Sequence, residues 1–514
     1  MPEAPSPAPS ANHRPTSGAP QVDRSHSILA ALKSPRRLRT EALAGLVVAL
    51  ALIPEAIAFS IIAGVDPRVG LFASFTMAVS IAFLGGRPAM ISAATGAIAL
   101  VIAPVAREYG MDYLIATVIL AGVLQVAMGL LGVAKLMRFI PRSVMVGFVN
   151  ALAILIFTSQ IPHLTDVPWA VYPLAIAGLV IIFLFPRLTK VIPAPLVAII
   201  VLTVITVAAA IAVPTVGDEG ELPDSLPSLF IPDVPWNLET LQIIFPFALT
   251  MALVGILESL LTAKLVDDIT DTHSNKTRES WGQGAANVIT GFFGGMGGCA
   301  MIGQTMINVK ASGARTRLST FLAGVFLLIL VVALGDVVAI IPMAALVAVM
   351  IFVSWATFDW HSIAPSTLRR MPKSETTVMV STVVVTVWTH NLAYGVIVGV
   401  IVAMVLFAHR VAHFTTVTRM DASDDDGQRV YQVEGELFFA SSNDLVYQFD
   451  YTGDPEKIVI DVSKAHIWDA STVAALDAVK TKYESRGKTA IILGMNQDSA
   501  ERHGRLSGAL SENH

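Results

Sequence analysis

Apolar segments of membrane-spanning length set the strongest limit on how this chain can fold. Stretches of roughly 20 apolar residues, enough for a helix to cross about 30 Å of hydrocarbon, recur between residues 42 and 409. Charged residues make up only 14% of the 514, against roughly 25% in an ordinary soluble domain. Water cannot solvate most of such a chain, so the sequence excludes a secreted or cytosolic globule.

The apolar segments form two sets, separated by an acidic stretch with several prolines at residues 216–237 that suits a long exposed loop. The first set is 42–62, 69–84, 90–105, 113–134, 143–160, 169–185 and 191–213. The second set is 242–266, 282–293, 299–310, 316–334, 337–355, 376–390 and 393–409. The sequence therefore predicts 14 spans, seven in each half.

Basic residues indicate how the predicted spans are oriented. With a cytoplasmic N-terminus, the predicted outer loops carry only Arg68 and Arg107, and the other loop lysines and arginines fall inside. The sequence therefore predicts a multi-pass protein of the plasma membrane, the bacterial inner membrane, with both termini cytoplasmic. An odd number of spans per half gives the two halves opposite orientations, as in an inverted repeat.

Two segments are too short and too rich in glycine to be plain membrane helices. They are GGRPAMISAATGAIALVIAP from Gly85 and GGMGGCAMIGQTMINVK from Gly294, the third segment of each half. In each, we expect an irregular stretch followed by a short helix, which is tolerated at membrane depth only inside protein or beside a wet cavity. Two such helix starts facing each other would bind an anion without a basic side chain. The alternative is that these glycines only allow close helix packing.

The predicted anion site consists of the residues at the starts of these two short helices. It comprises Ser92, Ala94, Thr95, Gly96, Ala300, Met301, Ile302, Gly303 and Gln304. Ser92, Thr95 and Gln304, with Thr305, supply neutral polar side chains. Phe59 of the first span is assigned either to packing or to the wall of this pocket.

Glu258 is a candidate for coupling transport to a second ion. A carboxylate inside a span costs on the order of 3 kcal/mol and needs a partner or a function. Glu258 could hold a proton, or it could bind sodium together with Thr262, one turn further along the helix. A buried neutral glutamate or an ion pair with Lys264 are the alternatives. Glu55 lies at the matching point of the first half, where Pro54 is expected to break the local hydrogen-bond ladder; capping of the freed backbone N–H groups is the alternative role of this carboxylate.

The C-terminal part of the chain has the composition of a soluble domain. Strands are predicted at RVYQVEG, KIVIDVS and KTAIILG, and a helix at 471–485 with Asp469 or Ser471 as its N-cap. We therefore predict a disordered tail at 1–35, a membrane domain at 36–412 and a small α/β domain at 413–514. The single cysteine, Cys299, excludes an intramolecular disulfide and is assigned to packing.

Several motifs resemble the sulfate permease family of anion transporters, also called SulP or solute carrier family 26, which ends in a STAS domain. The membrane motifs are IPEAIAFSIIAGVDPRVGLFAS, GGRPAMISAATGAIAL, FIPRSVMVGFVNALAILIF and, the most specific, SNKTRESWGQGAANVITGFFGG. VEGELFFASSN and IVIDVSKAHIWDASTVAALD are similar to the STAS domain. The resemblance implies an all-α membrane domain of 14 spans in two inverted seven-span repeats, divided into core and gate and usually dimeric. It also implies that the anion binds between the third and tenth spans.

Three positions depart from the family pattern. Gln304 stands where many members have arginine, and Glu258 and Ile302 stand where bicarbonate members have aspartate and threonine at their sodium site. We therefore expect secondary active uptake of bicarbonate or sulfate, coupled to protons through Glu258. A passive exchanger or channel, a sodium-coupled bicarbonate symporter and a membrane-tethered sensor remain alternatives. The sequence does not predict an enzyme, a structural metal or a cofactor other than a coupling H⁺ or Na⁺. The expected partners are a small inorganic anion, membrane lipid and a second copy of the chain, and no nucleic acid is expected.

Overall fold

The computed structural model describes residues 31–135, 140–188, 193–412, 415–420 and 428–507. Most of the expected N-terminal tail lies outside these residues. The chain divides into two compact units, of which the first holds most described residues up to Asp359 and the second most of those from Trp360 onward. Each unit is described by itself.

The helices follow the predicted apolar segments. Before the long loop, the chain forms α2 (Pro35–Ala63), α3 (Pro67–Leu84), β1 (Ser92–Ala93), α4 (Gly96–Tyr109), α5 (Met111–Leu130), α6 (Arg142–Thr158), α7 (Val171–Leu184) and α8 (Ala194–Ala208). After the loop come α9 (Leu238–Thr270), α10 (Lys276–Phe292), β2 (Cys299–Ala300), α11 (Ile302–Met306), η6 (Ile307–Ala311), α12 (Arg317–Ala333), α13 (Gly335–Ala339) and α14 (Met343–Thr357). The second unit adds α15 (Pro365–Arg370), α16 (Lys373–Thr389) and α17 (Leu392–Ala412). Within the described residues, six helices are long and apolar enough to cross a membrane, and four apolar helices are shorter.

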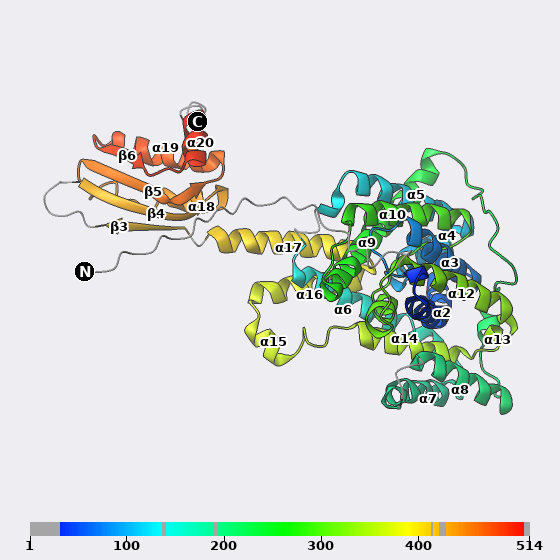
Figure 1. Cartoon of the computed structure of the whole chain (residues 1–514). Helices are drawn as coiled ribbons and strands as arrows, with labels where there is room; N and C mark the ends of the chain where they lie inside the picture. The colour runs from blue at the N-terminus through cyan, green and yellow to red at the C-terminus, as the bar shows by residue number, and fades with distance from the viewer. Residues whose placement is uncertain (1–30, 136–139, 189–192, 413–414, 421–427, 508–514) are drawn as a thin grey trace, which may run out of the picture. The chain divides into compact units, whose positions relative to one another are not determined.

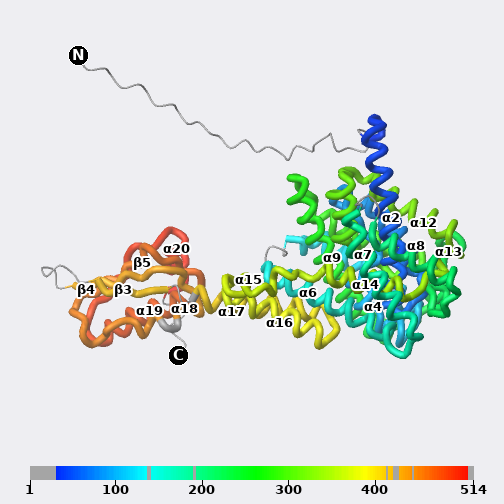
Figure 2. Tube along the Cα trace, turned by 90° about the horizontal axis from the view of Figure 1, so that it is seen from below, coloured from blue at the N-terminus to red at the C-terminus, as the bar shows by residue number. Residues whose placement is uncertain are grey.

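The first helix contains a proline in its interior. Helix α2 continues through Pro54 to Ala63. A proline removes one backbone hydrogen bond, and the packing of α2 against its neighbours maintains the helix on both sides. Helices α2, α3 and α12 lie side by side (Figures 1 and 2).

Glycines allow a close backbone contact between α5 and α10. A Cβ atom added at Gly284 would lie 2.5 Å from the carbonyl oxygen of Gly122, and one added at Gly122 would lie 2.6 Å from the carbonyl oxygen of Gly284. Both distances are shorter than a Cβ contact allows, so only glycine permits this backbone approach. Helices α7, α8 and α14 form another group, in which the Phe183 ring stacks edge-on against Trp355 at 5.0 Å.

The segment between α8 and α9 is the long loop that the sequence predicts. Its only described regular element is one 3₁₀ turn, η5 (Val216–Asp218). Its later part is attached to the helices of the first unit: the amide of Phe230 donates to the carbonyl of Phe292 at 2.7 Å, and that of Asp233 donates to the Asp112 carboxylate at 3.0 Å.

The second unit contains a four-stranded sheet in the order β3 (Thr416–Met420), β4 (Gln428–Leu437), β5 (Lys457–Ile467) and β6 (Thr489–Leu493). Strands β3 and β4 are antiparallel, whereas β4, β5 and β6 are mutually parallel. The three predicted strands are confirmed, and β3 is an addition. The remaining elements are α18 (Phe439–Leu445), α19 (Ala470–Glu484) and α20 (Gln497–Leu506).

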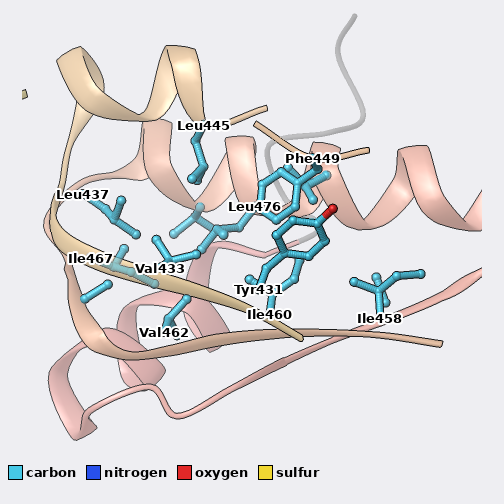
Figure 3. Packing of buried hydrophobic residues seen from close by; sticks show 14 of the residues in the cluster. Tyr431, Val433, Leu437, Leu445, Phe449, Ile458, Ile460, Val462, Ile467 and Leu476 are labelled. Atoms are coloured by element: carbon cyan, nitrogen blue, oxygen red, sulfur yellow. The ribbon is translucent and has the colours of Figure 1, made fainter. Parts of the chain in front are cut away.

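An apolar core joins this sheet to α18 and α19, as Figure 3 shows. Asp469 is the N-cap of α19 and accepts a hydrogen bond from the amide of Thr472 at 3.0 Å. The buried Asp454 carboxylate accepts from the hydroxyls of Tyr431 and Tyr483, both at 2.7 Å. Burial, together with this carboxylate, raises the pKa of both tyrosines, so the two hydroxyls keep their protons at neutral pH and bind the carboxylate.

Candidate functional site

The two glycine-rich segments meet in a short antiparallel pair of strands. Ser92 of β1 lies opposite Ala300 of β2, and Ala93 lies opposite Cys299. One further hydrogen bond extends the pair, from the amide of Met301 to the carbonyl of Ile91 at 2.8 Å. We call the paired residues Ser92–Ala93 and Cys299–Ala300 the crossing of β1 and β2. Helix α4 begins three residues after β1 and α11 two residues after β2, so both helices begin next to this crossing.

Helix α4 has a closed, well-packed start. The Thr95 side chain is its N-cap and accepts a hydrogen bond from the amide of Ile98 at 3.3 Å. A Cβ atom added at Gly96 would lie 2.9 Å from the ring of Phe59 and 3.1 Å from Ile156. The buried Phe59 ring therefore packs directly against the first turn of α4.

Helix α11 has an open start. Its N-cap residue, Met301, offers no side-chain hydrogen bond to the first turn. Gly303 is exposed, and a Cβ atom added there would meet nothing within 4 Å. The helix continues directly into the π-helical turn η6, a feature that is common at functional sites.

The first turns of both helices present free backbone amides, because the first amides of any helix lack an acceptor within it. Among the described residues, none accepts a hydrogen bond from the amides of Gly96, Ala97, Ile302, Gly303 and Gln304. The positive ends of both helix dipoles lie at the same crossing. This arrangement can bind an anion without a charged side chain.

Two of the polar side chains predicted near the site accept hydrogen bonds from other segments. The Ser92 hydroxyl is fully buried and accepts a hydrogen bond from the Gln283 amide nitrogen at 2.5 Å. The Thr305 hydroxyl accepts from the amide of Ile91 at 3.0 Å. Gln304 is buried, and its side chain lies close to the half-buried carboxyl group of Glu55. Of the other predicted donors, Thr95 lies at the start of α4 and Gln304 lies beside Glu55.

Glu258 is linked to the site through Cys299. The Cys299 thiol donates to the Glu258 carboxylate at 2.9 Å, and its sulfur lies 3.1 Å from the Thr95 hydroxyl. Glu258 is 7% exposed, and no salt bridge to it occurs within the described part of the chain. The ion pair with Lys264, one of the alternatives for Glu258, is thus not formed. Sequence reasoning assigned Cys299 to packing alone, and the only signal for its role was its position next to Ala300 in the glycine-rich segment.

Two serines that sequence reasoning missed hold the strand amides in place. The amide of Ala94 donates to the Ser74 hydroxyl of α3 at 3.3 Å, and that of Ala300 donates to the Ser259 hydroxyl of α9 at 3.1 Å. Ser259 follows Glu258 directly, so one turn of α9 contacts both Cys299 and Ala300. Sequence alone gave no sign of these pairings, because small hydroxyl residues are common in apolar helices.

Thr262, the predicted partner of Glu258 in a sodium site, makes a hydrogen bond within its own helix. The Thr262 hydroxyl donates to the backbone carbonyl of Glu258 at 2.8 Å, within its own helix. No group of three or more His, Cys, Asp or Glu side chains suited to a metal ion occurs in the described ranges.

The sequence profile of the sulfate permease family matches residues 38–172 and 165–382, and that of the STAS domain matches residues 419–510. The chain belongs to the sulfate permease family. Its members are transporters, so this permease is a multi-pass membrane protein that carries an anion across the membrane, with a C-terminal α/β STAS domain, and it is not an enzyme.

Known members of the family are similar to this permease over most of their length. YbaR of Bacillus subtilis (strain 168), provisionally named a sulfate transporter, is 53% identical over 90% of this chain and 95% of its own. The bicarbonate transporter BicA of Picosynechococcus is 26% identical over 89% of each chain.

Solved structures confirm the fold of the permease. The transmembrane domain of a cyanobacterial BicA is 25% identical, covers 72% of this chain and 98% of its own, and gives a TM-score of 0.62. The murine anion transporter Slc26a9, in its inward-facing state, is 17% identical, covers 96% of this chain and 92% of its own, and gives a TM-score of 0.79.

Proposed function

We propose that this permease is a proton-coupled symporter that takes up a small inorganic oxyanion at the crossing of β1 and β2. The observation that carries the proposal is the meeting of two helix starts whose amides have no acceptor in the described part of the chain. Thr95 and Gly96 line the closed side of the site, and Ile302, Gly303 and Gln304 line the open side.

Sulfate is the first candidate substrate, and bicarbonate is the second. The relative at 53% identity is provisionally named a sulfate transporter, whereas the two BicA relatives at 26% and 25% identity are named bicarbonate transporters. Both anions present oxygen atoms that accept hydrogen bonds from backbone amides. Gln304 supplies no positive charge, so the helix starts must provide most of the attraction.

Glu258 is the proposed proton carrier. A buried carboxylate without a cation partner is costly, whereas a protonated carboxyl group can be buried with a hydrogen bond. An anion at the α4 start would lie close to Thr95, which Cys299 links to Glu258. A bound anion and an ionised Glu258 carboxylate carry like charges, which disfavour each other when they lie close together. Binding of the anion therefore favours protonation of Glu258, and protonation of Glu258 favours binding of the anion. That mutual dependence is what symport requires.

We also propose the finer architecture that the family resemblance implies. Fourteen spans would form two inverted repeats, with α2–α8 in the first and α9–α17 in the second, where α13 and α15 are short connectors. The membrane domain would occupy residues 36–412 and the STAS domain residues 413–514. Both termini would be cytoplasmic in a homodimer of the plasma membrane.

The proposal is tested by uptake of labelled sulfate and labelled bicarbonate into proteoliposomes, with pH and sodium gradients varied independently. We expect an inward proton gradient to drive uptake and a sodium gradient to have no effect. Glu258→Gln should abolish the response to the proton gradient, because the amide cannot exchange a proton. Glu239→Gln is the matched control, since Glu239 is an exposed glutamate at the start of the same helix.

A passive exchanger or channel is the second candidate function. It would carry the anion down its own gradient, and neither the proton gradient nor Glu258→Gln would change the initial rate. That result would contradict symport while leaving the anion site in place. Uptake driven by sodium alone would instead favour the sodium-coupled mechanism.

A further inference from the structure

Helix α10 carries a stripe of polar side chains that the anion site itself does not use. Glu279, Gln283 and Asn287 follow one another at intervals of four residues, so they lie on one face of the helix. All three are fully buried. They belong to the segment SNKTRESWGQGAANVITGFFGG. Each of them bonds to a residue in or next to the paired strands.

Glu279 holds the approach to β1. One oxygen of its carboxylate accepts hydrogen bonds from the amide of Gly86 at 2.6 Å and from the amide of Arg87 at 2.9 Å. Hydrogen bonds to an ionised acceptor are among the stronger ones in proteins. The turn that leads from α3 into β1 is thus fixed to α10.

Gln283 holds β1 itself. Its amide nitrogen donates to the Ser92 hydroxyl at 2.5 Å and to the second oxygen of Glu279 at 3.0 Å. Ser92 is the residue that pairs with Ala300 of the other segment. Gln283 therefore connects the carboxylate at the turn to the crossing of the two strands.

Asn287 holds the approach to β2. Its side-chain oxygen accepts from the amide of Gly298 at 2.8 Å, and its nitrogen donates to the carbonyl of Gly298 at 3.0 Å. The same nitrogen donates to Gln125 of α5 at 2.8 Å. The Asn287 side chain thus bonds both the amide and the carbonyl of Gly298, as the backbone of a neighbouring strand would. Gly298 directly precedes Cys299, the first residue of β2.

Helix α10 also packs against α5 through its glycines. The close backbone contact between Gly284 and Gly122 packs α10 tightly against α5. One helix thus bonds both segments, β1 through Gln283 and the residue before β2 through Asn287.

We propose that Glu279, Gln283 and Asn287 are positioning residues, which set the distance between the α4 and α11 starts and thereby the affinity for the anion. The inference rests on the proposed function, because it assigns these residues to the same site. Amides on two helices can bind one small anion together only at a narrow range of separations, and a misplacement of about 1 Å can lower a rate by about 100-fold. None of the three residues exchanges the coupling proton.

The test measures KM and the maximal rate of anion uptake for Gln283→Met, Ser92→Ala and the double variant. Methionine has nearly the shape of glutamine but cannot donate a hydrogen bond. We expect each single variant to raise KM about tenfold, as the loss of a buried hydrogen bond would, with the maximal rate changed less than about twofold. The double variant should resemble the single variants, since both remove the same interaction.

Thr290→Val is the matched control. Thr290 is buried on the same helix and bonds the Thr76 hydroxyl of α3 at 2.8 Å, not the strands. It should leave KM within about twofold of the wild type. Proton dependence of uptake should stay normal in every variant, because Glu258 is unchanged.

Three results would overturn the inference: equal KM values in Gln283→Met and Thr290→Val, additive effects in the double variant, or a normal KM in Ser92→Ala. Ser92→Ala removes a single atom, so it decides the question even if Gln283→Met does not fold. Gly303→Leu separates this inference from the proposed function. If that variant transports normally, the proposed anion site is wrong; if it is inactive and KM is normal in Gln283→Met, only the positioning role is wrong.

Discussion

The two helix starts at the crossing differ in how they are closed. Helix α4 is 14 residues long, is capped by Thr95 and is covered by Phe59 at Gly96. Helix α11 has five α-helical residues before its π-helical turn, lacks a side-chain cap and is open at Gly303. The same local pattern, a glycine-rich stretch followed by a strand and a helix, thus gives a closed wall in one half and an open face in the other.

This difference assigns separate tasks to the two starts. The α4 side is held by packing and by its cap, so it can serve as a fixed wall for the anion. The α11 side has free space at Gly303, and we propose that the anion enters and leaves there. Substitutions at the two starts should therefore fail in different ways: those at α11 should block transport, and those at α4 should disturb packing or affinity.

The largest effect is expected for Gly303→Leu. Added atoms would fill the free space in front of the α11 amides without a clash at Cβ, so uptake should fall at least about 100-fold while thermal stability stays unchanged. Uptake into proteoliposomes and melting in detergent measure the two quantities. Gly504→Leu is the control, since a Cβ atom at Gly504 also meets nothing within 4 Å. Normal uptake by Gly303→Leu would show that the anion does not need the free space at the α11 start, which would contradict the separate roles of the two helix starts.

A smaller effect is expected for Thr95→Val. Valine keeps the shape of threonine but cannot accept the hydrogen bond from Ile98, and loss of an N-cap costs about 0.5–2 kcal/mol. We expect KM to rise about tenfold, because the first turn of α4 frays next to the anion. Thr316→Val removes the equivalent cap of α12, where Thr316 accepts from Leu318 at 3.2 Å. The comparison fails if Thr316→Val raises KM as much as Thr95→Val does.

The smallest change in transport is expected for Gly96→Ala. Its methyl group would press on the Phe59 ring at 2.9 Å, and overpacking of this kind costs about 1–3 kcal/mol. Thermal stability should fall, with uptake reduced only about threefold. Gly303→Ala is the matched variant and should be at least as stable as the wild type, because alanine is the better helix former. Equal melting temperatures for the two variants would show that the two starts are packed alike.

The sequence predicted most helices and the two interrupted segments, because apolar length and glycine content are local properties. The segments that begin at Gly85 and Gly294 each lead into the expected helix, and each also contains a two-residue strand that the sequence did not predict. Which side chains serve the strands could not be predicted, since Ser74, Ser259 and Gln283 come from three different helices. Such pairings depend on tertiary packing, and no periodicity in one helix encodes them.

Two individual outcomes show the same limit. Cys299 was assigned to packing, yet its sulfur lies between Glu258 and Thr95. Ser92 was predicted as an anion ligand, and its hydroxyl accepts a hydrogen bond from Gln283, a partner that the sequence did not predict. In both cases the residue was located correctly along the chain, and its partner came from a distant segment.

The position of a bound anion tests the central claim most directly. Crystals of the permease grown with selenate, a sulfate analogue, would show the anion by the anomalous scattering of selenium. We expect one peak at the crossing of β1 and β2, within about 3 Å of the Gly303 amide and of the first amides of α4, and no peak in Gly303→Leu. A selenate peak elsewhere along the membrane domain, or one that Gly303→Leu leaves unchanged, would contradict the central claim.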